Sequence, residues 1–395
     1  MKKYYPYLIT VSHMINDSCQ SILPALLPLF IYTYGLSLEQ AGFLILANTA
    51  LSSLLQPLLG YLSDKINQPR LIALGVLLSA CSTGVMGFVT SYESLLVCAT
   101  LAGVGSSIFH PEGAKIMNRL GGGKKGKAMG TFAIGGSSGF AIGPLFAGSI
   151  AYTVGPHGLA AFTVVGLIIS TILFILMPRI VAHARTIDQA VATENPTLVD
   201  KPLKNYWKYF GILFVIILSQ SVNFRVINAF IPIFWTRELG TSPEQGSFAL
   251  TVFFSIGIFM TYIGGLLGDK YGPIKIIRLS LLIWLPAMFL LTEVPTFSPV
   301  IMMPVAYLLL LMIGAAKAIS YSPVIVLGQT YLAKSIGFAS GITLGVSQTI
   351  GGIIAPVVGN LADTYTLPAA MMTLVPFLVV GLGASLILKD PKKLR

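Results

Sequence analysis

Twelve apolar segments, each close to the length of helix that crosses a lipid bilayer, follow one another along the chain. A bilayer core about 30 Å thick is crossed by about 20 apolar residues in a helix. The segments are separated by short breaks of charge, glycine and proline, and this pattern predicts an all-α, polytopic membrane protein of 12 transmembrane helices. They cover residues 7–34, 40–62, 70–90, 94–119, 127–152, 157–177, 208–235, 246–268, 274–292, 299–331, 335–362 and 367–388.

Composition supports a lipid environment. Of the 395 residues, 55% are hydrophobic and only 10% are charged, whereas a soluble domain carries roughly 25% charged residues. The three cysteines, Cys19, Cys81 and Cys98, all fall in predicted spans and lack metal-ligand spacing. We expect them to be small buried apolar residues.

The basic residues predict the orientation. If the N-terminus lies in the cytoplasm, all but three of the 25 basic residues fall on the inward side. The exceptions are Arg225 and Lys317 within spans and Arg237 in an outer loop. The positive-inside rule then places both termini in the cytoplasm. We expect the membrane to be a bacterial cytoplasmic (inner) membrane. The net charge of +11 therefore reflects topology, and we expect no nucleic-acid partner.

The two halves of the chain repeat, with four pairs of landmarks at a nearly constant offset. Internal repeats of this kind predict two pseudo-symmetric six-helix bundles that enclose a site. We assign residues 1–177 and 208–395 to the bundles and 178–207 to a cytoplasmic linker with a short amphipathic helix near 179–191. The tenth span is expected to break at Pro323. The matched landmarks are 60–65 with 265–270, Pro28 with Pro232, 109–111 with 321–323, and Gly143-Pro144 with Ala355-Pro356.

Ionisable residues inside the spans are the main functional signal, because each costs several kcal/mol in lipid unless it faces a cavity or a partner, roughly 2.5–3.5 on insertion scales. The first half contributes the acids Asp17 and Glu112, and the second half contributes the bases Arg225 and Lys317. One interpretation is a set of buried salt bridges that only hold the halves together. Such pairs stabilise poorly, because desolvation offsets much of the Coulomb gain. The other interpretation is a proton-coupled binding site.

For proton coupling we predict Asp17, Glu112, His110 and His13. His13 lies one helical turn before Asp17, so the two share a face, and imidazoles exchange protons near neutral pH. Asp17 is the first choice, because it is nearer the centre of its span. Glu112 lies about 200° from His110 around their helix. Its alternative role is a salt bridge at the inner rim, with Lys115 or Arg119.

For substrate binding we predict Arg225, Lys317, Tyr321, Asn223 and Gln220. Unpaired cations facing a cavity suit an anionic head group such as a phosphonate, carboxylate or hydroxamate. Arginine can hold such a group through two parallel hydrogen bonds. Tyr321, Asn223 and Gln220 would add stacking and polar contacts.

Residues 60–65 (GYLSDK) and 265–270 (GLLGDK) follow the second helix of each half and resemble the loop motif of the major facilitator superfamily. Asn67 departs from that motif, where the first copy lacks the later glycine. The resemblance covers the whole chain and implies a cavity lined by helices 1, 4, 7 and 10, which are the helices that carry the buried charges. It also implies a conformational latch, whose predicted members are Asp64, Lys65, Asp269, Lys270 and Arg119.

Helix 5 carries Gly139, Gly143 and Pro144, similar to the Gly-Pro motif of drug–proton antiporters in that superfamily. The same residues would also serve as a small-residue packing face with a proline kink. Within the superfamily, residues 12–17 (SHMIND) and 105–114 (GSSIFHPEGA) resemble the fosmidomycin-resistance-like exporters.

We therefore predict a proton-coupled exporter of small anionic or amphiphilic compounds, such as fosmidomycin-like antibiotics, working by alternating access. The proton gradient would be its driving force. We expect no enzyme activity, no cofactor, no metal and a monomer. The alternatives are a proton-coupled uptake symporter for a sugar or organic anion, and a membrane receptor or enzyme.

Overall fold

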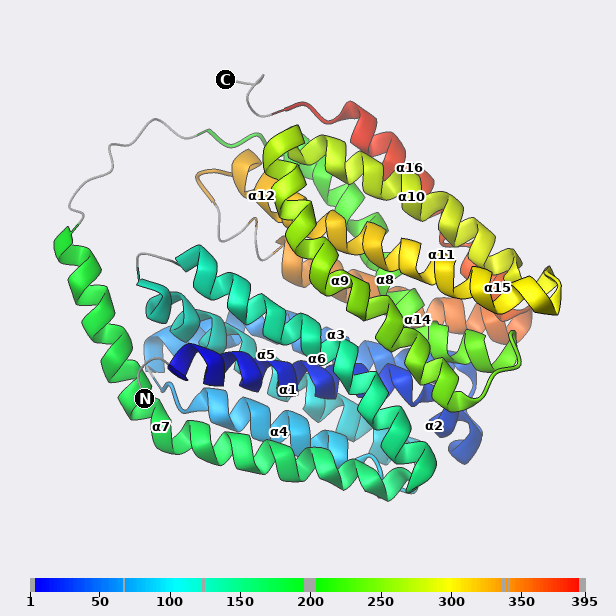
Figure 1. The fold of residues 1–395 in the computed structure, drawn as a ribbon, viewed down its shortest axis with the longest axis horizontal. Coiled ribbons are helices and arrows are strands. Elements are labelled where there is room, and N and C mark those ends of the chain that lie inside the picture. The colour runs from blue at the N-terminus through cyan, green and yellow to red at the C-terminus, as the bar shows by residue number, and fades with distance from the viewer. Residues whose placement is uncertain are drawn as a thin grey trace. The chain divides into compact units, whose positions relative to one another are not determined.

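The structure is a computed structural model that describes residues 4–66, 68–122, 125–194, 204–335, 339 and 342–390. Its contacts divide the chain into two compact units, residues 1–23 with 47–201 (unit 1) and residues 24–46 with 202–395 (unit 2). Apart from one isolated bridge between Asn205 and Leu332, the regular elements of the described residues are helices. The fold is all-α, as predicted (Figure 1).

The helices coincide with the predicted segments. Unit 1 holds most of α1 (Tyr5–Ala25), the later part of α3 (Leu38–Ile66), α4 (Leu71–Val85), α5 (Tyr92–Gly121), α6 (Lys125–Thr153), η3 (Pro156–Leu159) and α7 (Ala160–Glu194). Unit 2 holds the end of α1, α2 (Leu27–Tyr34), the start of α3, α8 (Trp207–Arg237), α9 (Pro243–Tyr271), α10 (Pro273–Glu293), η4 (Val294–Thr296), α11 (Pro299–Ile319), α12 (Tyr321–Tyr331), η5 (Ile342–Val346), α14 (Ser347–Thr364), α15 (Leu367–Met372) and α16 (Val375–Ile387).

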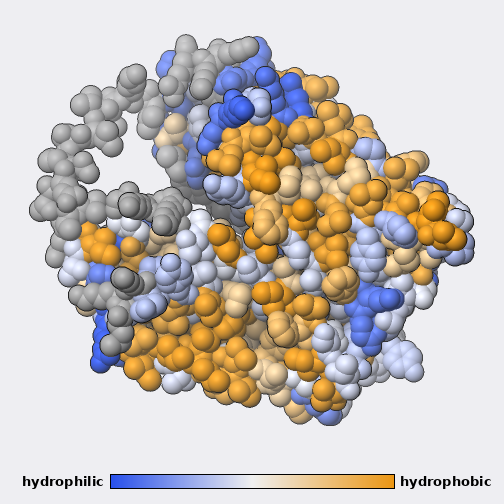
Figure 2. Space-filling model, in the orientation of Figure 1, coloured by the Kyte–Doolittle hydropathy of each residue, from blue (hydrophilic) through white to orange (hydrophobic). Residues whose placement is uncertain are grey.

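Nine helices of the described residues are long and apolar enough to cross a membrane, and the bent pair α1 and α2 makes a tenth span. The other two predicted segments contain α4, of 15 residues, and α14, of 18 residues. Figure 2 shows broad areas of apolar side chains on the visible surface. Phe259 is 67% exposed and Ile175 is 62% exposed, which suits lipid and not water.

Two breaks within the spans lie beside prolines. Pro24 and Pro28 flank the junction at Leu26, where α1 and α2 meet at a bend of 48°. The break predicted at Pro323 lies three residues earlier, at Ser320 between α11 and α12. Pro323 has no backbone N–H for the carbonyl of the residue four positions before it, and its ring crowds that carbonyl. By contrast, α5 runs unbroken through Pro111.

Helix α7 continues through Pro178 to Glu194 (Figure 1). The short amphipathic helix predicted for 179–191 is thus the end of a bundle helix. Ile180 and Ala184 are buried in the core of unit 1 beside Tyr5. The segment is therefore continuous with α7 and packs on unit 1, so the expectation of a separate short helix was wrong. The division into two six-helix domains stays a prediction from the repeat.

The start of α3 is anchored within unit 2. The two carboxylate oxygens of Asp363, at the end of α14, accept hydrogen bonds from the backbone N–H groups of Leu38 and Glu39, both at 2.9 Å. Gly42 lies directly against Pro356, since a Cβ at Gly42 would come within 2.5 Å of the proline Cα. Asp363 therefore caps the first turn of α3, where backbone donors have no partner in their own helix.

Candidate functional site

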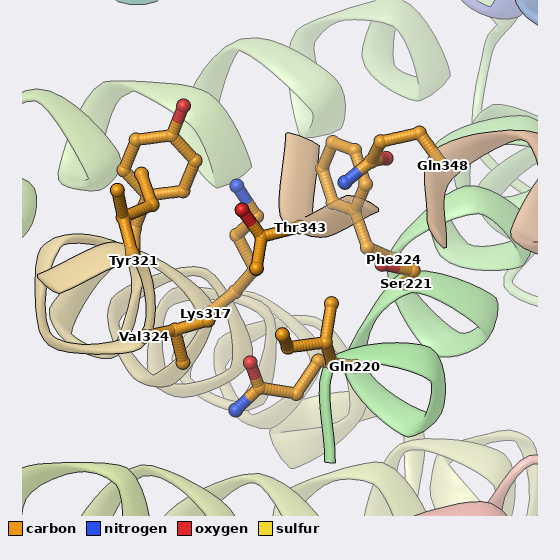
Figure 3. A pocket seen from close by; sticks show the side chains of 10 residues that line it. Gln220, Ser221, Phe224, Lys317, Tyr321, Val324, Thr343 and Gln348 are labelled. Carbon is orange, nitrogen blue, oxygen red and sulfur yellow. The ribbon is translucent and has the colours of Figure 1, made fainter. Parts of the chain in front are cut away.

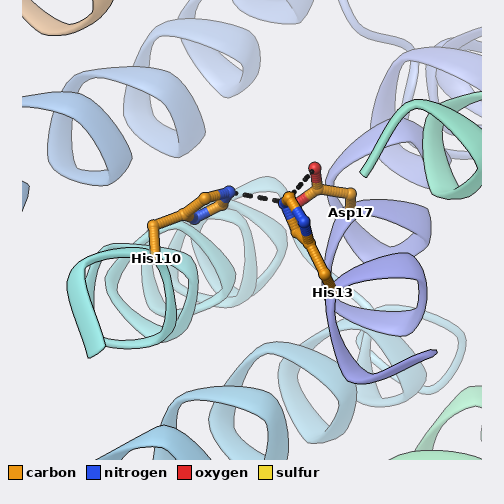
Figure 4. Close-up of side chains that lie close together, drawn as sticks. All are labelled: His13, Asp17 and His110. Carbon is orange, nitrogen blue, oxygen red and sulfur yellow. Dashed lines mark ion pairs between the residues drawn. The ribbon is translucent and has the colours of Figure 1, made fainter. Parts of the chain in front are cut away.

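Helices α1 and α5 bring three ionisable side chains together inside unit 1 (Figure 4). Nε2 of His13 lies 3.1 Å from Oδ2 of Asp17, and Nε2 of His110 lies 3.3 Å from Oδ1 of Asp17. We call His13, Asp17 and His110 the triad. The side chains of His13 and Asp17 are 8% and 6% exposed, and that of His110 is 26% exposed. The triad is thus shielded from two sides and open near His110.

Backbone carbonyls set the tautomer of both imidazoles. Nδ1 of His13 lies 2.7 Å from the Phe132 carbonyl oxygen, and Nδ1 of His110 lies 2.9 Å from the Ser106 carbonyl oxygen. A carbonyl only accepts hydrogen bonds, so each Nδ1 must carry the hydrogen. Without a further proton, each Nε2 would then point a lone pair at a carboxylate oxygen. Each Nε2–Oδ contact therefore requires a proton in the gap between the two atoms, carried by either of them. The alternative is one divalent cation that the carboxylate and both imidazoles share.

The glycines of α6 let that helix approach α1 beside the triad. A Cβ at Gly136 would lie 2.6 Å from His13 Cε1 and 2.7 Å from Asp17 Oδ2, and one at Gly139 would lie 2.3 Å from the Met14 carbonyl oxygen. At Gly143, a Cβ would lie 2.2 Å from a side-chain oxygen of α1. The glycine motif predicted from the sequence is a close-packing face, and α6 continues through Pro144.

Glu112 lies outside the triad. It is buried, with 3% exposure, and its Oε1 lies 3.7 Å from Nζ of Lys115, one helical turn along α5. The salt bridge that the sequence offered as its alternative role is present with Lys115. Glu112 and His110 thus have different partners, as the angle between them around the helix suggested.

Unit 2 contains a pocket between α8, α11, α12 and the start of α14, where Lys317 lies between two aromatic rings (Figure 3). Nζ of Lys317 lies 4.5 Å from the ring centroid of Phe224 and 5.0 Å from that of Tyr321. Cation–π contacts of this kind stabilise an ammonium group by about 0.5–2 kcal/mol. They hold the charge in place and leave it available to an anion.

Arg225 lies next to this pocket. Its Nε donates a hydrogen bond to Oε1 of Gln348, which lines the pocket, at 3.0 Å. Its guanidinium carbon lies 5.6 Å from the ring centroid of Phe224. In the part of unit 2 that the structure describes, no carboxylate forms an ion pair with Arg225 or Lys317. The pocket therefore carries positive charge with no acidic partner among those residues.

Gln220 adds a donor to the pocket. Its Oε1 accepts a hydrogen bond from Oγ of Ser320 at 3.3 Å, while its buried Nε2 has no hydrogen-bond partner among the described residues. A buried polar group is normally paired. The unpaired Nε2 and the two cations together favour a ligand rich in acceptor oxygens.

The residues that line the pocket differ in part from those predicted. Asn223 does not line the pocket: its amide donates to the carbonyls of Ser219 and Leu374, at 3.0 and 3.2 Å. The neighbouring side chain on a helix faces another direction, and Asn223 points towards Leu374, which precedes α16. Sequence reasoning missed Gln348, although a lone glutamine in a glycine-rich apolar segment is a signal that could have identified it.

The predicted latch stays a prediction. The side chains of Asp64 and Lys65 lie outside the described residues. Asp269 and Lys270 end α9, where Nζ of Lys270 lies 5.1 Å from the ring centroid of Tyr271. Arg119 lies in the last turn of α5.

Comparison with known proteins places the geometry in context. The family model of the Major Facilitator Superfamily matches residues 9–356 and 213–395. The uncharacterised MFS-type transporter YfnC of Bacillus subtilis (strain 168) is 30% identical over 393 residues, which cover 98% of this chain and 94% of that protein. The fosmidomycin resistance protein of Escherichia coli (strain K12) is 29% identical over 356 residues, covering 90% of this chain and 85% of that protein.

Solved structures share the fold. A bacterial homologue of the human lysosomal transporter Spinster, in an inward-facing and occupied conformation, gives a TM-score of 0.77 at 17% identity and covers 98% of this chain and 96% of that chain. A D-xylose–proton symporter gives 0.75 at 16% identity, with coverage of 98% and 96%. At these identities the likeness establishes the fold alone.

Proposed function

The chain belongs to the major facilitator superfamily of membrane transporters, and from this premise we propose that it is a proton-driven exporter of small anionic or amphiphilic compounds. One observation carries the choice of substrate class: the pocket of unit 2 contains Lys317, adjoins Arg225 and has no acidic partner among its described residues. A transporter of cations would place a carboxylate there. The similarity to a fosmidomycin resistance protein supports an anionic antibiotic as the first compound to test.

The proposed binding mode gives each pocket residue a separate task. The guanidinium of Arg225 would bind an oxyanion through parallel hydrogen bonds, and Lys317 would add a point charge. The buried Nε2 of Gln220 would donate to a further oxygen of the substrate. Tyr321, 39% exposed, would stack on the body of an amphiphilic compound.

Proton coupling is proposed for the triad, with Asp17 as its centre. Protonation from outside would fill the two gaps between the carboxylate and the imidazoles of His13 and His110. Loss of those protons would leave acceptors facing acceptors, and the triad would then open. Opening and closing of this contact between α1 and α5 would accompany alternating access. Glu112, paired with Lys115, takes the second place as a coupling acid.

The proposed direction is export across a bacterial cytoplasmic membrane, with both termini inside and the protein acting as a monomer. The Gly-Pro motif of α6 favours export, but its packing against α1 also explains the glycines. Uptake in symport is therefore the second candidate. Transport by vesicles of known sidedness separates the two, because an exporter accumulates substrate only in inside-out vesicles.

The proposal is tested by Arg225→Ala, with Arg237→Ala as the matched control. Both arginines lie on α8, but Arg237 is exposed in its last turn. Inside-out vesicles would be assayed for uptake of labelled fosmidomycin. We expect Arg225→Ala to lose at least about tenfold in transport, because a charge-assisted hydrogen bond contributes about 1.5–3 kcal/mol. Arg237→Ala should transport like the wild type. Equal transport by both variants would rule out the anion site.

A further inference from the structure

We propose that the triad of His13, Asp17 and His110 is also a binding site for a divalent transition-metal ion of the Zn²⁺ class. Two imidazole nitrogens and a carboxylate form a common ligand set for this ion. The sequence alone predicted no metal, because His110 is far along the chain from the other two. The inference goes beyond the proposed function, since the ion can bind whether or not protons drive transport.

The distances bring the three ligands within reach of one metal ion. Zinc lies about 2.0–2.1 Å from its nitrogen and oxygen ligands in a tetrahedron, which puts neighbouring ligand atoms about 3.3 Å apart. The Nε2–Oδ distances of the triad are 3.1 Å for His13 and 3.3 Å for His110. One ligand atom from each of the three residues lies within 4.8 Å of the other two. The two contacts use different oxygens of Asp17, so bringing one oxygen and both Nε2 atoms to tetrahedral spacing needs shifts of at most about 1.5 Å.

The surrounding hydrogen bonds are those of a metal site. A ligating histidine usually donates its other ring N–H to a carbonyl or carboxylate, which fixes its tautomer and raises its basicity. Both imidazoles do so here, His13 to the Phe132 carbonyl and His110 to the Ser106 carbonyl. The carboxylate is also oriented, because Nδ2 of Asn16 donates to Oδ1 of Asp17 at 3.0 Å.

Charge favours the same conclusion. The two gaps in the triad require two protons, and a divalent ion brings the same charge of +2. Replacing the protons by the ion leaves the net charge of this buried site unchanged. No additional charge has to be desolvated, so the low-dielectric surroundings that penalise an unbalanced charge do not oppose the exchange.

The site also has an approach and an open position. The His110 side chain is 26% exposed, so an ion can reach the triad from that side. Three protein ligands leave one tetrahedral position for water, as in zinc sites that are not closed. A bound ion would tie α1 to α5. If the triad must open during transport, a step that rests on the proposed function, Zn²⁺ would inhibit transport.

The test uses the full-length protein in detergent, with its affinity tag removed, titrated with Co²⁺ as a spectroscopic probe. We expect a visible absorption band of four-coordinate Co²⁺ that saturates at one ion per chain and is displaced by Zn²⁺. Asp17→Asn and His110→Gln should each weaken binding by at least about 100-fold, since even outer-shell changes cost about 10–100-fold. His157→Gln is the matched control, because His157 also places Nδ1 near a backbone carbonyl, that of Gly87 at 2.8 Å, but has no part in the triad.

Three results would overturn the proposal: no Co²⁺ band in the wild type, a band that survives both Asp17→Asn and His110→Gln, or one that His157→Gln removes. Asn16→Ala provides a second variant, which keeps all three ligand side chains of the triad. It removes the hydrogen bond that orients the carboxylate, together with a longer one to Oγ of Ser106 at 3.4 Å, and it should weaken Co²⁺ binding by about 10–100-fold. Unchanged binding would also count against the site. A separate assay of Zn²⁺ inhibition in vesicles tests the link to transport, so binding without inhibition would reject only that link.

Discussion

A single missing side chain governs the geometry of the triad. Gly136 has no Cβ, and this allows the backbone of α6 to lie against His13 and Asp17. A Cβ atom essentially never lies within 3.0 Å of another heavy atom, so any larger residue at Gly136 must push these side chains or the helix away. The triad therefore depends on a residue that has no functional group.

We predict that Gly136→Ala abolishes proton-coupled transport. The added methyl group would displace the imidazole of His13 from Asp17, because the atoms that it meets are the ends of these two side chains. Gly130→Ala on the same helix is the control, since a Cβ there meets no atom within 4 Å. Transport rates in vesicles and thermal unfolding of the purified variants would be compared. Similar behaviour of the two variants would show that α6 does not position the triad.

Lys317 illustrates the cost of an unpaired charge. It is held by aromatic rings rather than by a carboxylate, and it is repelled by Arg225. Replacing a buried ion pair by apolar side chains of similar volume is often neutral or stabilising, and a charge without a partner in a low-dielectric site costs more than a paired one. A residue of this kind favours function over stability.

Lys317→Met should therefore raise the Tm by a few degrees while transport of an anionic substrate falls by at least about tenfold, in line with the loss of a charge-assisted contact. Lys317→Arg keeps the charge and should retain part of the transport. Both quantities would be measured on the same preparations. A variant that loses stability and transport together would instead assign Lys317 to the packing of the bundle.

At the scale of elements, the start of α3 depends on a residue of a distant helix. Asp363 accepts two backbone hydrogen bonds from the first turn of α3, and Nδ2 of Asn360 donates to Oε2 of Glu39 at 2.9 Å. These bonds join a segment of the first sequence repeat to a helix of the second. Movement between the repeats during transport would have to break them.

We expect Asp363→Ala to loosen this contact, because loss of a helix cap costs about 0.5–2 kcal/mol. A cysteine at Leu38, which is 2% exposed, would report the opening in a background without the native cysteines. Its rate of labelling by a maleimide should rise about tenfold for each 1.4 kcal/mol lost. Thr364→Ala is the neighbouring control and should label like the parent. An unchanged rate in Asp363→Ala would mean that the cap does not hold α3 in place.

At the scale of the whole molecule, the prediction concerns coupling between substrate and protons. In proteoliposomes with an imposed pH gradient, adding fosmidomycin should start a proton flux through the wild type. Asp17→Asn should abolish this flux, because the amide keeps the shape of the side chain but cannot bind and release a proton. His157→Gln should leave the flux unchanged. Absence of substrate-dependent flux in the wild type would reject proton coupling altogether.

Part of the fold and part of the candidate site could be predicted from local chemistry alone. The length of each apolar segment predicted the helices, because hydrophobic length and backbone hydrogen bonding act within one segment. Pro323 similarly predicted the break in the tenth span, since a proline acts on the turn before it. The placement of Asp17, His110, Arg225 and Lys317 inside spans identified them as candidate functional residues, because the cost of charge in lipid needs no knowledge of neighbours.

Tertiary structure decided which of these residues act together. The rotation of α5 about its axis decides whether His110 or Glu112 faces Asp17. In the same way, the rotations of α8 and α14 about their own axes place Asn223 outside the pocket and Gln348 in its lining. Such rotations are set by close contacts between segments that are far apart in the chain, as Gly136 of α6 makes with α1. The sequence by itself determined the helices and the charges they carry. Only packing decided that two imidazoles converge on one carboxylate while two cations of the other unit have no acidic partner among its described residues.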